Sequence, residues 1–391
     1  MNLSIPLLAY SFRPFFLLTG LYGALVIAGW IAVLLGGLPL PVGWSPVHWH
    51  SHEMLFGMVS AAISGFLLTA MCNWTGATPL RNGGLLALVL LWLAGRIAMW
   101  TAGWLPAGMA AVIDLLFLPV LGIYALRVLI RHNNRRNLVL GAILLLLTLA
   151  NLLMHAGFLQ RNLQWLQWGE NMAFNLITLM MAVIAGRITP AFSANWLRAK
   201  GGPAERILIS PPLDRAVLIA TALLVPADFV SGLPVVTGTL ALAVAALHAV
   251  RLGLWRGWLV AGEPLLWILH VAYLWIVLAL ILKGLGAFEL VPPSVWQHAL
   301  GVGGIGTLII GVMTRVGLGH TGRPLRLPPL VIGLYGAILL AAVIRILTAL
   351  QWFDYRLGLM LAATGWIIAF AGFSVLYWPI LSRPRPDGRP G

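Results

Sequence analysis

The sequence predicts an all-α, polytopic membrane protein, and three observations support this fold class. Hydrophobic residues make up 61% of the 391 residues and charged residues only 9%, whereas soluble domains carry about 25% charged residues. Apolar runs of about 18 residues or more recur along the chain, each long enough to cross a bilayer as a helix. The basic residues behind the net charge of +14 lie mostly in short connections between these runs. We therefore expect a lipid bilayer, and no nucleic acid, as partner.

Taken in order, the apolar runs predict twelve transmembrane helices. Gly and Pro residues punctuate most connections, as expected of turns. The connections are short, so we predict one integral-membrane domain over residues 1–381 and a disordered basic tail over 382–391. The predicted spans are 15–36, 51–72, 84–104, 107–130, 137–159, 168–192, 214–231, 235–254, 263–285, 294–317, 329–348 and 356–381.

The basic residues also predict the orientation of the chain. When the 24 Lys and Arg residues are assigned to alternating sides of the twelve spans, one side receives only five of them, namely Arg96, Arg161, Lys283, Arg345 and Arg356. The side richer in Lys and Arg is the cytoplasmic one. We therefore predict that both termini are cytoplasmic and that the segment from His48 to Glu53 lies at the outer face.

The second span recurs in the tenth. A shift of 246 residues brings His52 onto His298, Gly57 onto Gly303 and Gly65 onto Gly311. The sixth span matches more loosely at a shift of 121, so the pattern indicates three pseudo-repeats of four helices. The alternative is that Gly-rich membrane helices resemble one another by chance. In each repeat the small residues, spaced four apart, form a stripe that lets another helix or a flat cofactor approach the backbone.

Histidines near the outer face are the candidate metal ligands, because imidazole binds iron and copper well. If residues 48–52 are extended, His48, His50 and His52 share one side; if they are helical, only His48 and His52 do. If the small-residue stripes face a common centre, His52 and His298 meet there. The alternative is that His and Trp residues only line the membrane interface. The candidate ligands are His50, His52, His155 and His298, with Glu53 and Glu170 as candidate proton donors.

Other residues have two open interpretations each. His270 is either a cofactor ligand or a hydrogen-bonded core residue, and His320 either caps a helix, contacts lipid or binds a ligand. Arg187 and Arg315 pair either with haem propionates or with lipid phosphate. Arg96 and Asp114 lie inside adjacent spans and predict an ion pair, with a proton path as the alternative. His132 and His248 neighbour Arg residues and are predicted to lie at the interface.

Several kinds of site are excluded by the sequence. The single Cys72 rules out an intrachain disulfide and any multi-cysteine metal site. There is no Walker-type glycine loop, no Cys-x-x-Cys-His attachment for covalent haem and no His-Glu-x-x-His zinc motif. These absences argue against an ATPase, a c-type cytochrome and a membrane zinc protease.

The sequence resembles the NnrS family of bacterial membrane proteins. The resemblance rests on motifs spread over residues 12–324: Phe12-Arg13-Pro14-Phe15-Phe16, Trp49-His50-Ser51-His52-Glu53-Met54-Leu55-Phe56-Gly57, Gly186-Arg187-Ile188-Thr189-Pro190, and Gly317-Leu318-Gly319-His320-Thr321-Gly322-Arg323-Pro324. It implies twelve helices in the bacterial cytoplasmic (inner) membrane, non-covalent haem b, copper, and a role against nitric oxide stress in denitrifying and other bacteria. It also implies that the metal-ligand candidates are His50, His52, His298 and His320, with Glu53 beside them. His155 and His270 are compatible with it, whereas His48 is not a ligand of the family.

These expectations combine into a functional hypothesis. The protein is expected to bind and detoxify nitric oxide at haem and copper, with reduction of nitric oxide as the further step and an unknown electron donor. Haem–copper oxidases are an architectural analogy, since they also carry metal-binding His on helices 2 and 10 of twelve, but analogy of fold does not establish chemistry. The alternatives are a non-catalytic transporter or sensor of copper, haem or nitric oxide, or an assembly factor for a respiratory complex.

Overall fold

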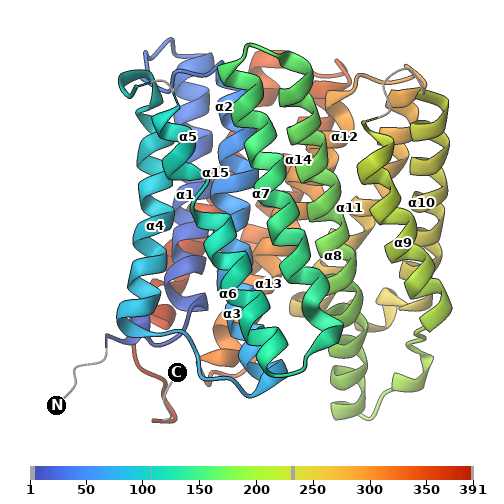
Figure 1. The fold of residues 1–391 in the computed structure, drawn as a ribbon. Coiled ribbons are helices and arrows are strands. Elements are labelled where there is room, and N and C mark those ends of the chain that lie inside the picture. Colours follow the sequence, from blue (N-terminus) through green and yellow to red (C-terminus); the bar gives the residue numbers. More distant parts are fainter. Residues whose placement is uncertain (1–4, 107, 230–233, 389–391) are drawn as a thin grey trace. The chain divides into compact units, whose positions relative to one another are not determined.

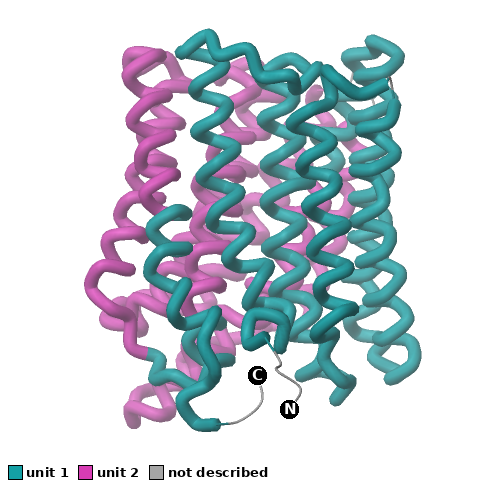
Figure 2. Tube along the Cα trace, turned by 90° about the vertical axis from the view of Figure 1, so that its left-hand side faces the viewer, with its two compact units in different colours: residues 1–173, 316–325, 370–391 teal, residues 174–315, 326–369 magenta. Residues whose placement is uncertain are grey.

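The computed structural model describes residues 5–106, 108–229 and 234–388, and these residues form helices and connections without any strand (Figure 1). The chain divides into two compact units, which Figure 2 colours separately. Unit 1 comprises residues 1–173, 316–325 and 370–391, and unit 2 comprises residues 174–315 and 326–369.

The helices coincide with the predicted spans. All twelve predicted spans fall on them, although residue 107 of the span 107–130 and residues 230 and 231 of the span 214–231 lie outside the described residues. The α-helices are α1 (Phe12–Leu34), α2 (Pro46–His52), α3 (Val59–Thr75), α4 (Asn82–Trp100), α5 (Met109–Asp114), α6 (Phe117–Arg131), α7 (Leu138–Leu159), α8 (Leu163–Ala199), α9 (Pro211–Ala227), α10 (Pro234–Leu254), α11 (Pro264–Ala287), α12 (Ser294–His298), α13 (Thr307–His320), α14 (Pro329–Ala349) and α15 (Tyr355–Leu381). The π-helices η2 (Glu53–Met58) and η7 (Ala299–Gly306) join α2 to α3 and α12 to α13.

Eleven of the helices in the described residues are long and apolar enough to span a membrane, so the chain is an integral membrane protein. The remaining candidate, α9, has 17 residues and is roughly 26 Å long at about 1.5 Å per residue. Nη1 of Arg13, at the start of α1, donates to the backbone oxygen of Leu381, at the end of α15, at 2.7 Å. The first and last helices therefore meet at one side, which requires an even number of crossings. We infer that α9 also crosses.

The π-helices support the predicted repeat. In each case the widened segment begins at the residue directly after the matched histidine, Glu53 after His52 and Ala299 after His298. These starting points are 246 residues apart, which is the shift that aligns the second and tenth spans. π-Helical turns are rare and are often found at functional sites, so a chance coincidence at the same register is a poor explanation. The local structure therefore supports a true repeat of these two spans.

Protein side chains fill the small-residue stripes. A Cβ atom on Gly57 would lie 2.8 Å from Nη1 of Arg96, and one on Gly65 would lie 2.7 Å from the ring of Phe16. In unit 2, Gly303 lies against the indole of Trp275, and Gly311 against Ile268. Of the two uses predicted for the stripes, these contacts match close helix packing.

Buried ion pairs connect the helices of unit 2. Nζ of Lys283 donates to Oδ2 of Asp228 at 2.5 Å and to Oδ1 of Asn175 at 3.0 Å. Burial of a charge in a membrane protein is costly unless the charge is paired, so these contacts explain how Lys283 is tolerated inside α11. The ammonium group also lies 4.4 Å from the ring centre of Trp296.

A second buried cluster in unit 2 corrects one prediction. His248 is fully buried, not interfacial, and its ring lies 2.8 Å from the hydroxyl of Tyr273 and 3.0 Å from that of Thr221. Arg251, one turn further along α10, pairs with Asp214 at 2.7 Å. The neighbouring Arg residue is the reason for predicting an interfacial position, but the side chain of Arg251 is itself only 4% exposed.

The predicted disordered tail makes specific contacts where the structure describes it, at residues 382–388. Arg13 donates to the backbone oxygen of Arg383 at 2.8 Å, and Arg385 donates to that of His320 at 2.9 Å. Arg385 also pairs with Asp387 at 2.5 Å. Residues 389–391 lie outside the described residues.

Candidate metal centre

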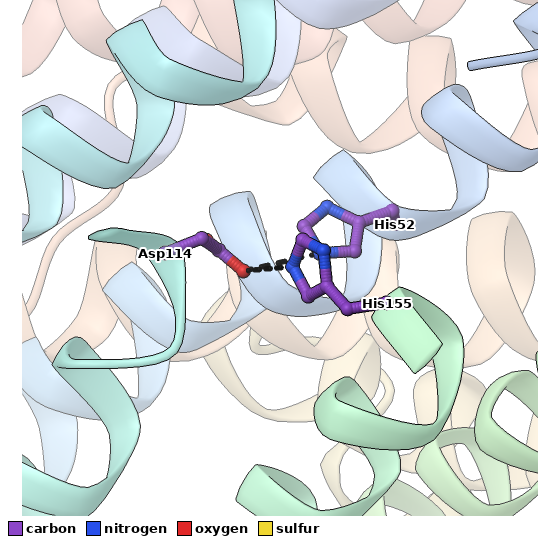
Figure 3. Close-up of side chains that lie close together, drawn as sticks. All are labelled: His52, Asp114 and His155. Atoms are coloured by element: carbon purple, nitrogen blue, oxygen red, sulfur yellow. Dashed lines mark hydrogen bonds and ion pairs between the residues drawn. The ribbon is translucent and has the colours of Figure 1, made fainter. Parts of the chain in front are cut away.

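Three buried side chains from three helices of unit 1 converge on one point. His52 is the last residue of α2, Asp114 the last of α5, and His155 lies one turn before the end of α7. Figure 3 shows the two imidazole rings turned toward the carboxylate of Asp114. All three residues are at most 2% exposed. Among the described residues they are the one group of His, Cys, Asp or Glu side chains whose geometry could hold a metal ion.

The spacing of the donor atoms fits a metal ion. Nε2 of His52 lies 3.2 Å and Nε2 of His155 lies 3.0 Å from Oδ2 of Asp114, and one ligand atom from each residue lies within 4.8 Å of the others. Metal–ligand bonds of about 2.0–2.2 Å place neighbouring ligand atoms roughly 3 to 3.5 Å apart. Two imidazoles and one carboxylate suit iron, copper or zinc, and leave coordination positions open.

A second layer of side chains orients these donors. Nδ1 of His52 lies 2.8 Å from Oε1 of Glu53, which also accepts from Arg96 at 2.5 Å. Arg96 pairs with Asp114 as well, so the predicted ion pair between α4 and α5 is present. The Tyr22 hydroxyl donates to the other oxygen of Glu53. A carboxylate on the far nitrogen of a ligating histidine is the usual arrangement at metal sites, because it fixes the ring and raises its basicity.

Oxygen atoms flank both ring nitrogens of His52. Nδ1 faces Glu53, while Nε2 lies 2.9 Å from Oδ1 of Asn151 and 3.2 Å from Asp114. The assignment of the Asn151 amide is consistent, because its Nδ2 donates to Asp114 at 2.7 Å. A ring with two protons, or with one proton and a metal ion on Nε2, satisfies these oxygens; if the Glu53 carboxyl group is itself protonated, one proton on the ring is enough. When both carboxylates are ionised, they face the single guanidinium group of Arg96, and a bound metal cation would balance the remaining charge.

An aromatic residue from the connection before α2 covers the cluster. The indole of Trp44 is 5% exposed, and its ring centre lies 5.2 Å from that of His52 and 5.3 Å from that of His155. It stacks on Phe158 at 4.6 Å. Trp44 thus excludes water from one side of the donors, and the absence of water there strengthens electrostatic interactions inside the site.

The profile of one protein family, described as NnrS protein, matches residues 6–385, nearly the whole chain. The chain belongs to the NnrS family. The family resemblance inferred from the motifs is thus confirmed, and the chain is a membrane protein of a family linked to the nitric oxide response and associated with metals and haem. No curated protein matches the chain.

Two further outer-face candidates of this NnrS-family chain lie in unit 1 beside the cluster. Residues 46–52 are helical, so His50 points away from His52, and its ring stacks on Trp30 with ring centres 4.4 Å apart. The Glu170 carboxyl group lies beside the hydroxyl of Ser51. Proton delivery by Glu170 or by Glu53, which is held by Tyr22, His52 and Arg96, stays a prediction.

The remaining candidate ligands have defined local partners. In unit 2, His298 donates from Nδ1 to the backbone oxygen of Ser294 at 2.7 Å. Nε2 of His270 lies 3.0 Å from the Ser193 hydroxyl, as the hydrogen-bonded interpretation requires, while its buried Nδ1 has no hydrogen-bond partner among the described residues. In unit 1, His320 ends α13 with its ring centre 5.7 Å from that of Phe12.

The two arginine candidates belong to unit 2. Arg187 lies half-buried in α8. The guanidinium carbon of Arg315 lies 4.3 Å from the ring centre of Phe192. The predicted meeting of His52 with His298 would join the two units and also stays a prediction.

Sequence reasoning missed the role of one donor, Asp114, and of one neighbour of the donors, Asn151. Asp114 was recognised as the partner of Arg96 but not as a metal ligand. Asn151 was not singled out, although it lies four residues before His155 and hence on the same face of α7. That spacing, together with a polar residue in an apolar span, was the available signal.

Proposed function

We propose that the protein binds nitric oxide at a metal ion held by His52, Asp114 and His155, and so protects the cell against nitrosative stress. The observation that supports this proposal most directly is the convergence of the three buried donors, with the Glu53 carboxylate at the far ring nitrogen of His52. Membership of the NnrS family supports nitric oxide as the ligand. A bound ferrous or cuprous ion would supply an open coordination position for this small, neutral molecule, which can reach the site through the bilayer.

Copper is the first metal to test, and iron is the second. The family resemblance favours copper, and divalent copper binds nitrogen and oxygen donors more tightly than the other first-row metals. A set of two histidines and one carboxylate is also typical of non-haem iron. Haem b is the further proposed cofactor, with His298, His270 and His320 as candidate axial ligands and Arg187 and Arg315 as candidate partners of the propionates.

The chain's own residues would set the properties of the site. Glu53 and Arg96 hold His52 in the orientation and tautomer that presents Nε2 to the metal. Trp44 keeps water out on one side of the donors. Reduction of nitric oxide would consume one electron and one proton per molecule, so catalysis as a nitric oxide reductase requires an electron donor that is still to be identified. We also propose the bacterial cytoplasmic membrane as its location, with both termini inside.

The test combines metal analysis with nitric oxide binding on the purified full chain. We expect about one non-haem iron or copper ion per chain in the wild type, and a change in its absorption or paramagnetic resonance spectrum when nitric oxide is added to the reduced protein. His155→Gln should lose both the metal and the response. His132→Gln, which alters a ring at the exposed end of α6, is the matched control. Wild-type metal content in His155→Gln would refute the site.

The runner-up function is a non-catalytic transporter or sensor of copper, haem or nitric oxide. The repeat of His52 and His298 in matching helices favours it, because internal repeats are common in transporters. Pre-reduced protein that binds nitric oxide without consuming it would indicate a sensor, whereas metal flux into sealed vesicles would indicate a transporter.

A further inference from the structure

Four arginines gather at the end of unit 1 where α1 begins and α15 ends. We call this group the basic cluster; it consists of Arg13, Arg323, Arg383 and Arg385. Arg13 is fully buried, and its Nη1 donates to the backbone oxygens of Leu381 and Arg383 at 2.7 and 2.8 Å. Arg323 and Arg385 are its charged neighbours. Three segments far apart in the sequence thus bring their guanidinium groups together.

Within the described part of unit 1, one acidic side chain lies among these four charges. Unit 1 contains four acidic residues. Glu53, Asp114 and Glu170 belong to the opposite end of the unit, so Asp387 is the one acidic residue that unit 1 supplies here. Asp387 is engaged by Arg385, through two contacts of 2.9 and 2.5 Å. The basic cluster therefore carries an excess of positive charge.

The backbone holds the cluster in place. Arg385 donates to the backbone oxygen of His320, and Arg13 anchors the segment after α15. These contacts are made to neutral carbonyl groups, which position the guanidinium groups without removing their charge. Burial and repulsion from Arg383 lower the pKa of Arg323, as expected where like charges are kept close.

The position of the basic cluster indicates which kind of anion it binds. The ends of α1, α13 and α15 are the ends of membrane-spanning helices, so the cluster lies at the depth of lipid headgroups. Guanidinium groups bind phosphate oxygens in pairs, and basic pockets between helix ends bind anionic headgroups. We propose that the basic cluster binds the phosphate group of an anionic lipid in the leaflet on the side of the termini.

The experiment is native mass spectrometry of the purified full chain titrated with phosphatidylglycerol, with phosphatidylcholine as the neutral reference. We expect saturable binding of phosphatidylglycerol at one preferred site. Each basic residue near a membrane surface contributes about fivefold in affinity, so Arg323→Gln combined with Arg383→Gln should weaken binding roughly thirtyfold. These two side chains are half-buried and exposed, respectively, and their replacement leaves the anchoring contacts of Arg13 and Arg385 intact.

The matched control is Arg131→Gln combined with Arg215→Gln. Both residues are exposed, are predicted to lie on the same side of the membrane and are outside the cluster, so this variant should bind phosphatidylglycerol as the wild type does. Arg383→Gln alone, at an exposed position, should show a loss of about fivefold and guards against a folding defect in the double variant. Equal losses in both double variants, or none in the cluster variant, would overturn the proposal. Displacement of the lipid by an equal concentration of inorganic phosphate would also overturn it, by showing that the site takes a free anion.

Discussion

Replacing Asp114 by Asn tests the candidate metal centre most directly. The change keeps the shape of the side chain but removes a charge that pairs with Arg96 and faces His52 and His155. Removal of one partner from a buried ion pair destabilises a protein by about 3–5 kcal/mol. Loss of a donor should weaken metal binding by at least about 100-fold, since loss of a supporting residue already costs roughly 10- to 100-fold.

The assay measures thermal unfolding and metal content on the same purified samples. Asp228→Asn is the control, because Asp228 also forms a buried ion pair, with Lys283 at 2.5 Å, while its partners in the described part of the chain are an ammonium and an amide group. Both variants should unfold at lower temperature than the wild type, and only Asp114→Asn should lose its metal. A metal content in Asp114→Asn equal to that of the wild type would show that the carboxylate is purely structural.

Three further predictions concern packing, charge and metal removal. Gly57→Ala should lower the free energy of unfolding by about 1–3 kcal/mol and reduce metal content, because its Cβ would displace Arg96. The control is Gly83→Ala, which has open space around its Cβ. This variant should be neutral or slightly stabilising in the same chemical unfolding assay. Lys283→Met should destabilise by about 3–5 kcal/mol by stranding the Asp228 charge, and adding Asp228→Asn should restore much of the loss; an unimproved double variant would refute this pairing. Chelation should lower the thermal midpoint, by an amount equivalent to about 2.7 kcal/mol if the metal was present at 100 times its Kd, and re-addition of metal should reverse it.

Hydropathy predicted the helices well because a segment that crosses the bilayer must pair its backbone N–H and C=O groups within itself, as an α-helix does. It placed the start of α14 at residue 329, where the structure has Pro329, and the end of α15 at residue 381, where the structure has Leu381. The sequence also selected His52 and His155 as candidate metal ligands. The structure brings both imidazoles beside Asp114 in the candidate metal centre, and their role as ligands stays a prediction.

The remaining details depend on tertiary packing. The choice of Asp114 as the third donor follows from α5 lying against both α4 and α7, which no local pattern reveals. His50 was included because an extended segment would have turned it toward His52, but Pro46–His52 is a helix begun by Ser45 and Pro46. The partners of His248 were missed because Thr221 and Tyr273 belong to other helices.

The widened turns after His52 and His298 change how these helices should be drawn. Each added residue in a turn rotates everything beyond it by about 100° about the helix axis. A helical wheel drawn through either span with regular spacing would therefore assign the histidine and the glycines below it to the wrong relative faces. Removing a single residue from Glu53–Met58 should turn the His52 imidazole away from Asp114 while leaving the span long enough to cross the bilayer. The number of residues in this segment therefore determines the orientation of His52 as much as their identity does.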